Sequence, residues 1–142
     1  MPELMEVKYA SEEYKALLDI RYQVLRQPLG MELREKDIAT DHEEYHFAAY
    51  ENGAPIGCVL LKPQSQKGRI QLRQMAVLND WRGKGIGARL VVFAENFSRE
   101  KGYYAVEARA RRNVQEFYAK LGYISHEHEF ADEHTLKMIK LL

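Results

Sequence analysis

The sequence predicts an α/β domain whose central sheet is mixed but mostly antiparallel and is flanked by helices. Two apolar runs within residues 45–63 surround Asn52-Gly53, a dipeptide that strongly favours a hairpin. A strand, a long amphipathic helix and another strand follow between residues 69 and 110, which indicates one right-handed β-α-β crossover. The sheet is therefore expected to start antiparallel and to contain one parallel pair of strands.

The first part of the chain is predicted to form a strand and a capped helix. The strand covers residues 5–10, and Ser11 caps the helix that follows. The apolar stripe of this helix contains one charged residue, Arg21, which either extends to solvent or anchors the segment beyond the helix. The helix ends before Gly30, and residues 31–44 are expected to hold a short helix and loops.

The remaining elements alternate between strands and helices until two strands close the chain. The helix that follows the crossover strand has Ile86, Leu90, Phe93 and Phe97 on one face. The elements are expected in the order strand 69–78, helix 84–101, strand 103–110, helix 112–122, and strands 123–130 and 134–142 around a loop at 131–133.

Composition limits the possible functions. The chain has 142 residues, which suits one domain covering residues 1–142. Its 21 basic and 21 acidic residues give zero net charge, which argues against a general nucleic-acid binder. Cys58 is the single cysteine, so no internal disulfide is possible and a reducing cytoplasm is expected. The N-terminus lacks a signal-peptide pattern, and no apolar run approaches the ~18 residues of a membrane span.

A glycine-rich loop opens the long helix. Gly83, Gly85 and Gly87 alternate with other residues, and Arg82 and Lys84 add positive charge. A helix N-terminus presents unpaired backbone N–H groups, and glycines let a bulky anion come close to them. The loop therefore predicts a phosphate or pyrophosphate site.

Several interpretations of the loop compete. The Walker pattern G-x-x-x-x-G-K-[ST] is absent. Gly83, Gly85 and Ala88 fit the dinucleotide pattern G-x-G-x-x-A, and Glu107 lies where a ribose-binding acid would be expected. That pattern should follow the first strand of a repeated parallel fold, and here a hairpin precedes it. A glycine-rich helix start without a ligand is the remaining alternative.

Two segments decide between these interpretations. "MAVLNDWRGKGIGARL" contains the pattern R-x-x-G-x-G at Arg82, Gly85 and Gly87, and "NVQEFYAKLGY" follows the next strand. This combination resembles the GNAT superfamily of acyl-CoA N-acyltransferases, in element order over the whole chain and specifically at 73–90 and 113–123. The resemblance implies a sheet that splays beside the loop strand to admit the cofactor, acetyl-CoA, without a metal.

The resemblance also assigns roles to residues. The loop would hold the coenzyme A pyrophosphate, the preceding strand would pair with the pantetheine arm, and the last helix would contact the cofactor. Phe117 is either part of that contact or a core residue. The implied cofactor-binding residues are Met75, Ala76, Val77, Arg82, Gly83, Lys84, Gly85, Ile86, Gly87, Ala88, Asn113 and Phe117.

The implied reaction is direct attack of an amine on the acetyl thioester. The resemblance assigns Tyr118 as the general acid that protonates the leaving thiolate, although it could also be a tyrosine at the edge of the core. Many family members place a glutamate on the loop strand, but this chain has "QLRQMAV" there. The general base is therefore left open between Glu107, His42, Glu43, Glu44 and His46. A coenzyme A-binding sensor without catalysis is the alternative function.

The acceptor is expected to be a small-molecule or peptide amine, and the protein a monomer or homodimer. Arg21, Arg34 and Tyr45 are implied acceptor-side candidates. The acids Asp37, Asp41, Glu43 and Glu44 indicate either a solvated face or a site for a cationic acceptor. His126, His128 and His134 lack the spacing of a metal site, so a metal is not expected.

Overall fold

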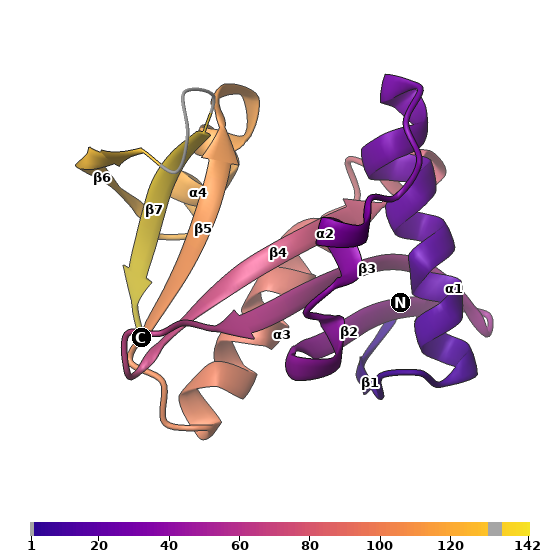
Figure 1. Cartoon of the computed structure of the whole chain (residues 1–142), viewed down its shortest axis with the longest axis horizontal. Helices are drawn as coiled ribbons and strands as arrows, with labels where there is room; N and C mark the ends of the chain where they lie inside the picture. Colours follow the sequence, from indigo (N-terminus) through magenta and orange to yellow (C-terminus); the bar gives the residue numbers. More distant parts are fainter. Residues whose placement is uncertain (1, 131–134) are drawn as a thin grey trace.

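The protein forms one seven-stranded sheet in the order β1-β2-β3-β4-β5-β7-β6 (Figure 1). The computed structural model describes residues 2–130 and 135–142, with side chains described for all of these except 126–130. Every neighbouring pair of strands is antiparallel except β4 and β5, which are parallel. The strands are β1 (Glu3–Val7), β2 (Tyr45–Glu51), β3 (Ala54–Pro63), β4 (Arg69–Val77), β5 (Ala105–Arg111), β6 (Ile124–Phe130) and β7 (Thr135–Leu141).

Helices lie on both faces of the sheet. Helix α1 (Glu12–Arg21) and helix α2 (Glu35–Ile38) lie in front of β2–β4 in Figure 1, and α3 (Ile86–Glu100) lies behind the sheet. The short helix α4 (Gln115–Lys120) contributes Tyr118 to the core that α3 covers. We refer to these as the α1 face and the α3 face. Helix α1 packs on β3 and β4, and its Tyr14 also contacts His46 of β2.

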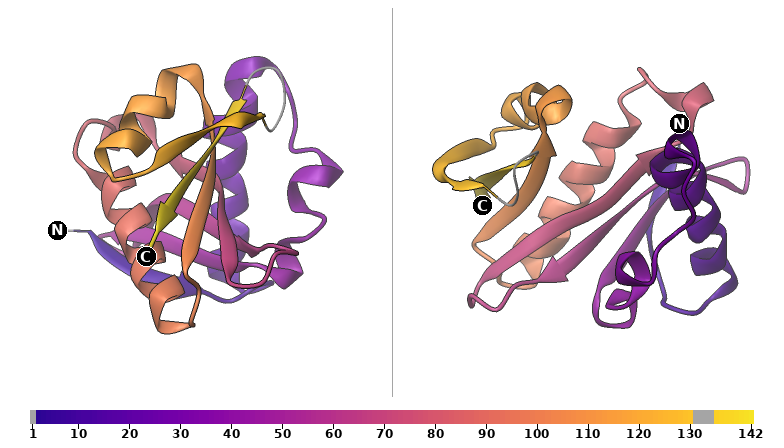
Figure 2. Two further views of the ribbon diagram at one scale, coloured as in Figure 1. Left: turned by 90° about the vertical axis from the view of Figure 1, so that its left-hand side faces the viewer. Right: turned by 45° about the horizontal axis from the view of Figure 1, so that its top comes forward.

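Strands β4 and β5 separate part of the way along their length. Their parallel pairing runs from Arg69–Ala105 to Leu72–Ala108 and then stops, although both strands continue. Beyond Leu72, β4 stays paired with β3 and β5 stays paired with β7. The two strands diverge in Figure 1 and in the right-hand view of Figure 2. One edge of β4 is thus left without a neighbouring strand from Arg73 to Val77.

A β-bulge marks the point of separation. Leu60 pairs with Arg73 and Cys58 pairs with Ala76, so two residues of β4, Gln74 and Met75, oppose one residue of β3. Gln74 has φ 52°, a left-handed value that is unusual for a residue other than glycine. Bulges bend a strand and redirect its side chains, and here the bend turns β4 away from β5.

The predicted fold class is confirmed, but several predicted boundaries are wrong. The first strand covers Glu3–Val7 rather than 5–10, because Ala10 adopts φ 66° just before the Ser11 cap. After α1 the chain continues as a π-helical turn, Tyr22–Arg26, and a 3-10 turn, Gln27–Leu29. The long helix begins at Ile86 rather than at residue 84, because the glycine loop extends to Gly85. The helix expected at 112–122 is a 3-10 turn followed by α4. Residues 131–134 lie outside the described residues.

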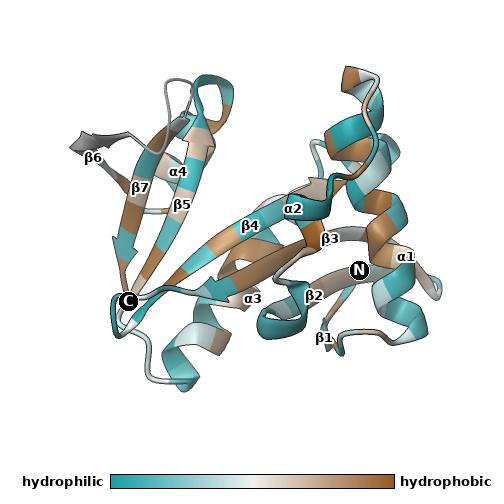
Figure 3. Ribbon diagram, in the orientation of Figure 1, coloured by the Kyte–Doolittle hydropathy of each residue, from teal (hydrophilic) through white to brown (hydrophobic). Residues whose placement is uncertain are grey.

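The main core lies between the sheet and α3. Leu90 is fully buried there together with Val91, Ala94 and apolar residues of β2–β5, whereas Val92 on the opposite side of the helix is 44% exposed. Hydropathy alternates along β4, which packs one face on this core (Figure 3). Because α3 begins at the glycine loop, this core fixes the position of the loop relative to β4.

We expect Leu90→Ala to lower the free energy of unfolding by about 2–5 kcal/mol, since it leaves a cavity in a closely packed core. Val92→Ala, on the exposed side of the same helix, should change it by less than about 1 kcal/mol. Chemical denaturation of both variants measures the difference. Equal losses in the two variants would contradict the assignment of Leu90 to the core.

Candidate active site

The glycine loop presents free backbone N–H groups and positive charge. Among the described residues, no backbone acceptor is recorded for the N–H groups of residues 83–88. Gly83 and Gly85 have φ 74° and 79°, and a Cβ at either position would meet no atom within 4 Å. Arg82 and Lys84 are exposed; the Arg82 Nε donates to the Val77 carbonyl at 3.3 Å, and Lys84 Nζ lies 4.9 Å from the centre of the Trp81 ring. These features fit a large anion such as a pyrophosphate.

The loop, the free edge of β4 and helix α4 meet at Gly87. A Cβ at Gly87 would lie 3.5 Å from Phe117 Cζ and 3.8 Å from Met75 Sδ, which is ordinary van der Waals contact. Three predicted cofactor residues from three elements are therefore neighbours on the α3 face. Phe117 also packs against the main core, so its two predicted roles are compatible.

The two other predicted cofactor residues of β4, Ala76 and Val77, pack their side chains in the two cores. Ala76 is buried in a second core with α1, and Val77 packs against the main core. Their pairing with β3 leaves the other edge of the strand without a neighbouring strand. The loop residues Ile86 and Ala88 belong to the first turn of α3, where backbone N–H groups lack helical partners.

Tyr118 lies in the main core and is 7% exposed. Its ring contacts those of Phe117 and Tyr123, with centroid distances of 5.1 and 5.4 Å. Burial raises the pKa of Tyr118 to about 12, so its hydroxyl stays protonated at physiological pH. Asn113 is exposed in the 3-10 turn Arg112–Val114, which precedes α4, so it lies outside the helix that carries Phe117.

Arg21 holds the β4 bulge to residues 31–44, which we call the acceptor-side segment because it contains the implied acceptor-side residue Arg34. Its side chain is fully buried, and it donates to Asp41 Oδ2 at 2.6 Å, to the Asp37 carbonyl at 2.6 Å and to Gln74 Oε1 at 3.3 Å. Tyr14 donates its hydroxyl to the same Asp41 oxygen at 2.7 Å. Of the two predicted roles for Arg21, anchoring is confirmed.

Further ion pairs extend this network. Asp37 accepts from Arg26 Nε and Nη2 at 2.8 and 2.6 Å and from the Arg34 backbone N–H at 2.8 Å. Burial alone would raise the pKa of Asp37, but these hydrogen bonds lower it far below its usual value. Glu44 accepts from Arg73 Nη1 at 2.5 and 2.6 Å and from the Thr40 hydroxyl at 2.5 Å.

The expectation for the acids in 37–44 is therefore wrong for three of them. Asp37, Asp41 and Glu44 are 4%, 0% and 7% exposed, so they form neither a solvated face nor a site for a cation. Each is bound by at least one arginine, and a carboxylate in such a pair does not attract a second cation strongly. Sequence spacing could not show this, because Arg21 and Arg73 lie far from their partners in the chain.

The five candidates for the general base differ in their exposure and in their partners. The Glu107 carboxylate lies 3.1 Å from Arg69 Nη2 and 2.8 Å from Lys137 Nζ, and Glu44 is held by Arg73. His46 is 1% exposed, and its Nε2 lies 2.8 Å from the Asp41 carbonyl. His42 and Glu43 are exposed and pair with each other at 3.5 Å.

Tyr45, an implied acceptor-side candidate, does not lie on the same face of the sheet as Arg21. It packs on Phe97 with a centroid distance of 4.8 Å and so lies on the α3 face, whereas Arg21 lies on the α1 face. Alternation along β2 explains this, since His46 rather than Tyr45 points toward α1. Sequence reasoning missed Gln74, whose role depends on the bulge. It gave Arg73 no role, although Arg73 lies at the point of separation.

Other polar groups lie outside the site. Cys58 is buried and its pKa is raised to about 12 by burial, which suits a packing residue. No group of three His, Cys, Asp or Glu side chains could hold a metal within the described part of the chain, and the side chains of His126, His128 and His134 lie outside it. None of the described helices is both long and apolar enough to span a membrane.

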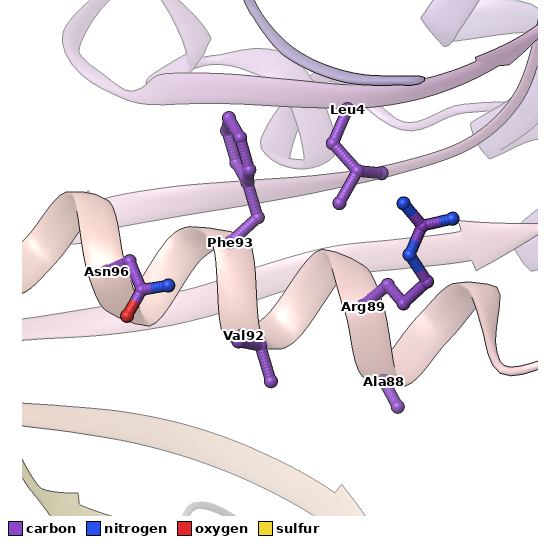
Figure 4. Close-up of a pocket in the computed structure, with 6 residues that line it drawn as sticks. All are labelled: Leu4, Ala88, Arg89, Val92, Phe93 and Asn96. Atoms are coloured by element: carbon purple, nitrogen blue, oxygen red, sulfur yellow. The ribbon is translucent and has the colours of Figure 1, made fainter. Parts of the chain in front are cut away.

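A separate pocket lies where Leu4 of β1 meets helix α3 (Figure 4). It is lined by Leu4, Ala88, Arg89, Val92, Phe93 and Asn96. Ala88 is the only predicted site residue in this lining, so the pocket is not the predicted cofactor site.

Known proteins resemble this chain in sequence or in fold. The chain is 33% identical over 127 residues to the uncharacterized N-acetyltransferase YitI of Bacillus subtilis (strain 168), and the match covers 84% of this chain and 83% of that protein. An acyl-CoA N-acyltransferase from Pseudomonas aeruginosa has the same fold, with a TM-score of 0.84 at 20% identity over 99% of both chains. The PaiA N-acetyltransferase from Thermoplasma acidophilum, in complex with coenzyme A, has a TM-score of 0.75 at 17% identity over 99% of both chains.

The mixed sheet, with β4 and β5 paired over only part of their length, therefore belongs to the class of acyl-CoA N-acyltransferase folds. The family model for the acetyltransferase (GNAT) family matches residues 11–123, and this chain belongs to that family. The resemblance that segments 73–90 and 113–123 indicate is therefore confirmed.

The ion pair of Asp37 predicts a specific dependence of stability on pH. The pKa of Asp37 is lowered by folding, so its contribution to stability is present above its unfolded pKa of about 3.9 and is lost as pH falls below that value. Asp37→Asn should cost about 3–5 kcal/mol at neutral pH, because Arg26 is left buried without its partner.

Denaturation between pH 7 and pH 2 measures both effects. The wild type should lose stability below about pH 4 more steeply than Asp37→Asn. Glu116→Gln is the control, since its pair with Lys120 is 83% and 75% exposed. Parallel stability curves for wild type and Asp37→Asn would show that the Asp37 pair does not form.

Proposed function

We propose that the protein is an N-acetyltransferase that transfers the acetyl group of acetyl-CoA to a primary amine of a small molecule or peptide by direct attack. The observation that carries this proposal is the free edge of β4, which ends in a glycine loop with free N–H groups. We further propose that the catalytic domain covers residues 1–142 and is cytoplasmic, consistent with its single cysteine, and that it is a monomer or homodimer.

The residues present fit coenzyme A. The N–H groups of residues 83–88, with Arg82 and Lys84, would hold its phosphates, and the free edge of β4 at Met75, Ala76 and Val77 would pair with the amide-bearing arm. Phe117 and Gly87 would line the same path, and Asn113 lies exposed nearby in sequence. When bound, acetyl-CoA supplies a thioester carbonyl that an amine attacks and a thiol that leaves.

The chain itself would position and polarise the reacting groups. Backbone N–H groups on the free edge of β4 suit donation to a carbonyl oxygen as negative charge develops on it. Tyr118 would donate its proton toward the leaving sulfur. A thiol has a pKa of about 8.5, well below the pKa of about 12 of Tyr118, so donation of a hydrogen bond contributes more than complete proton transfer.

A coenzyme A-binding sensor is the second candidate, and one observation favours it. Every carboxylate proposed as the base, apart from the exposed Glu43, is held by arginine or lysine. Release of free thiol from acetyl-CoA in a panel of amines separates the two candidates. A catalyst turns over with at least one amine, whereas a sensor binds coenzyme A without turnover.

The loop assignment is tested by a matched pair of variants. Gly85 has φ 79°, which both Asp and Asn tolerate better than most residues, so the two variants should fold alike. Gly85→Asp should weaken acetyl-CoA binding roughly tenfold or more relative to Gly85→Asn, because like charges about 4 Å apart repel by a few kcal/mol. Titration calorimetry measures both constants. Equal affinities would remove the pyrophosphate from this loop.

Tyr118→Phe tests the catalytic assignment. It keeps the ring in the core and removes the hydroxyl, so acetyl-CoA affinity should be retained while kcat falls by roughly 10²-fold or more. Tyr123→Phe is the control. The hydroxyl of this neighbouring tyrosine donates to Glu95 at 2.8 Å, so it is not expected to donate to the leaving sulfur. Thiol release from acetyl-CoA, measured for both folded variants at saturating substrate, compares their kcat values directly. A normal kcat in Tyr118→Phe would make Tyr118 a packing residue.

A further inference from the structure

The α1 face of β4 and β5 is basic beyond the point where the strands separate. Leu72, Ala108 and Ala110 belong to the main core on the α3 face. Side chains alternate along a strand, so Arg73 on β4 and Arg109 and Arg111 on β5 point to the opposite face. Pairing ends at Leu72 and Ala108, and the next residues are therefore Arg73 and Arg109, one on each side of the separation.

Two of these arginines have no acidic partner among the described residues. Arg73 is neutralised by Glu44, and Glu107 is shared by Arg69 and Lys137. Arg109 and Arg111 are exposed, and no ion pair links either of them to another described residue. The other buried acids of the acceptor-side segment, Asp37 and Asp41, are bound by Arg26 and Arg21. The described part of this face thus has a surplus of positive charge.

This face is the one from which an acceptor would approach. The inference rests on the proposed function, in which the cofactor lies along Met75, Gly87 and Phe117 on the α3 face. A group that passes between β4 and β5 from the α3 face meets the α1 face beside Arg73 and Arg109. No helix lies in front of β5 and β7 on this side in Figure 1.

We propose that the acceptor is an amine that carries its own carboxylate, such as an α-amino acid, and that Arg109 binds this carboxylate, with Arg111 adding to the attraction. A guanidinium matches a carboxylate with two parallel hydrogen bonds and fixes its orientation. An acceptor with only positive charge, such as a polyamine, is repelled by the same surplus of charge. Arg109 is thus a specificity-determining residue.

The same charge favours the reactive form of the amine. Nearby cations disfavour an ammonium group, so an amine held beside Arg109 loses its proton more readily. Its nitrogen then forms the new bond to the acetyl carbon, the C–S bond breaks and the sulfur leaves with the bonding electrons. The nitrogen loses one of its two protons to solvent and keeps the other in the amide, while the sulfur leaves as a thiolate that accepts a hydrogen bond from Tyr118 and takes a proton from solvent. An amine anchored by its carboxylate therefore needs less assistance from a general base.

The experiment compares each α-amino acid of a panel with its carboxamide, which keeps the amine and removes the carboxylate. Spermidine serves as the cationic acceptor, and thiol release from acetyl-CoA gives kcat/KM. The best amino acid should exceed its carboxamide by about tenfold or more, the effect of one charge-assisted pair. The ratio should fall at high salt, because exposed charges are screened.

Arg109→Gln should bring the ratio of acid to carboxamide close to one, mainly through KM, and Arg109→Lys should restore part of it. The control is Arg99→Gln, which removes an exposed guanidinium on α3 that donates to Asn96 and should leave the ratio as in wild type. Acetyl-CoA affinity of each variant verifies the fold.

Two results would overturn the inference. One is faster acetylation of spermidine or of the carboxamides than of every amino acid, and the other is an unaltered ratio in folded Arg109→Gln. Both leave the proposed function intact, since an amine is still acetylated. Absence of thiol release with every amine in the panel, with coenzyme A still bound, would instead refute catalysis itself.

Discussion

The buried guanidinium of Arg21 holds together the two parts of the chain that meet at the candidate active site. It connects α1 to Asp41 and to the Asp37 carbonyl on the acceptor side, and to Gln74 in the bulge of β4. Gln74 occupies a left-handed conformation that costs energy for a residue with a side chain, so the contact stabilises a bend that the strand would otherwise resist. That bend separates β4 from β5 and leaves the free edge on which the proposed cofactor site depends. A buried charge without its partner is costly, so Arg21 and Asp41 depend on each other.

Electrostatic pairing divides the molecule into a neutral interior and a charged face. The acids of the acceptor-side segment are satisfied inside the fold by Arg21, Arg26 and Arg73. Because these pairs consume the negative charge of that segment, basic residues dominate the described part of the α1 face at β5. Zero net charge of the whole chain thus conceals a local surplus. On the proposed function, this surplus rather than the overall charge governs which acceptor binds.

The parts of the structure that could be predicted are those encoded by local patterns. The Asn-Gly hairpin, the β-α-β crossover and the glycine loop each depend on neighbouring residues, and the sequence positions agree with the structure to within a few residues. The bulge at Gln74 could not be predicted, because it arises from the register between β3 and β4. The burial of Asp41 likewise depends on Arg21, twenty positions away in the chain. The face on which Tyr45 lies could not be predicted for a related reason, since the face of a β2 residue is fixed only when the strand pairs. Alternation in "AVEARAR" was a usable signal for Arg109, because its neighbours Ala108 and Ala110 are core residues.

The two faces of the sheet carry different kinds of constraint. On the α3 face, the loop and the path toward Tyr118 are built from glycines, Met75 and aromatic rings, so their positions depend on close packing with α3 and α4. On the α1 face, the acceptor-side segment is held by ion pairs, which tolerate a change of side chain only if the charges still balance. Arg109 is exempt from this constraint, because it is exposed and bears no structural ion pair with a described residue. Under the proposed function, a change of acceptor could therefore arise by substitution at Arg109 without loss of the fold or of coenzyme A binding. The acceptor and coenzyme A can be bound by different residues because the two faces of the sheet meet only along the free edge of β4. The bulge that creates this edge is held from the α1 face by Arg21.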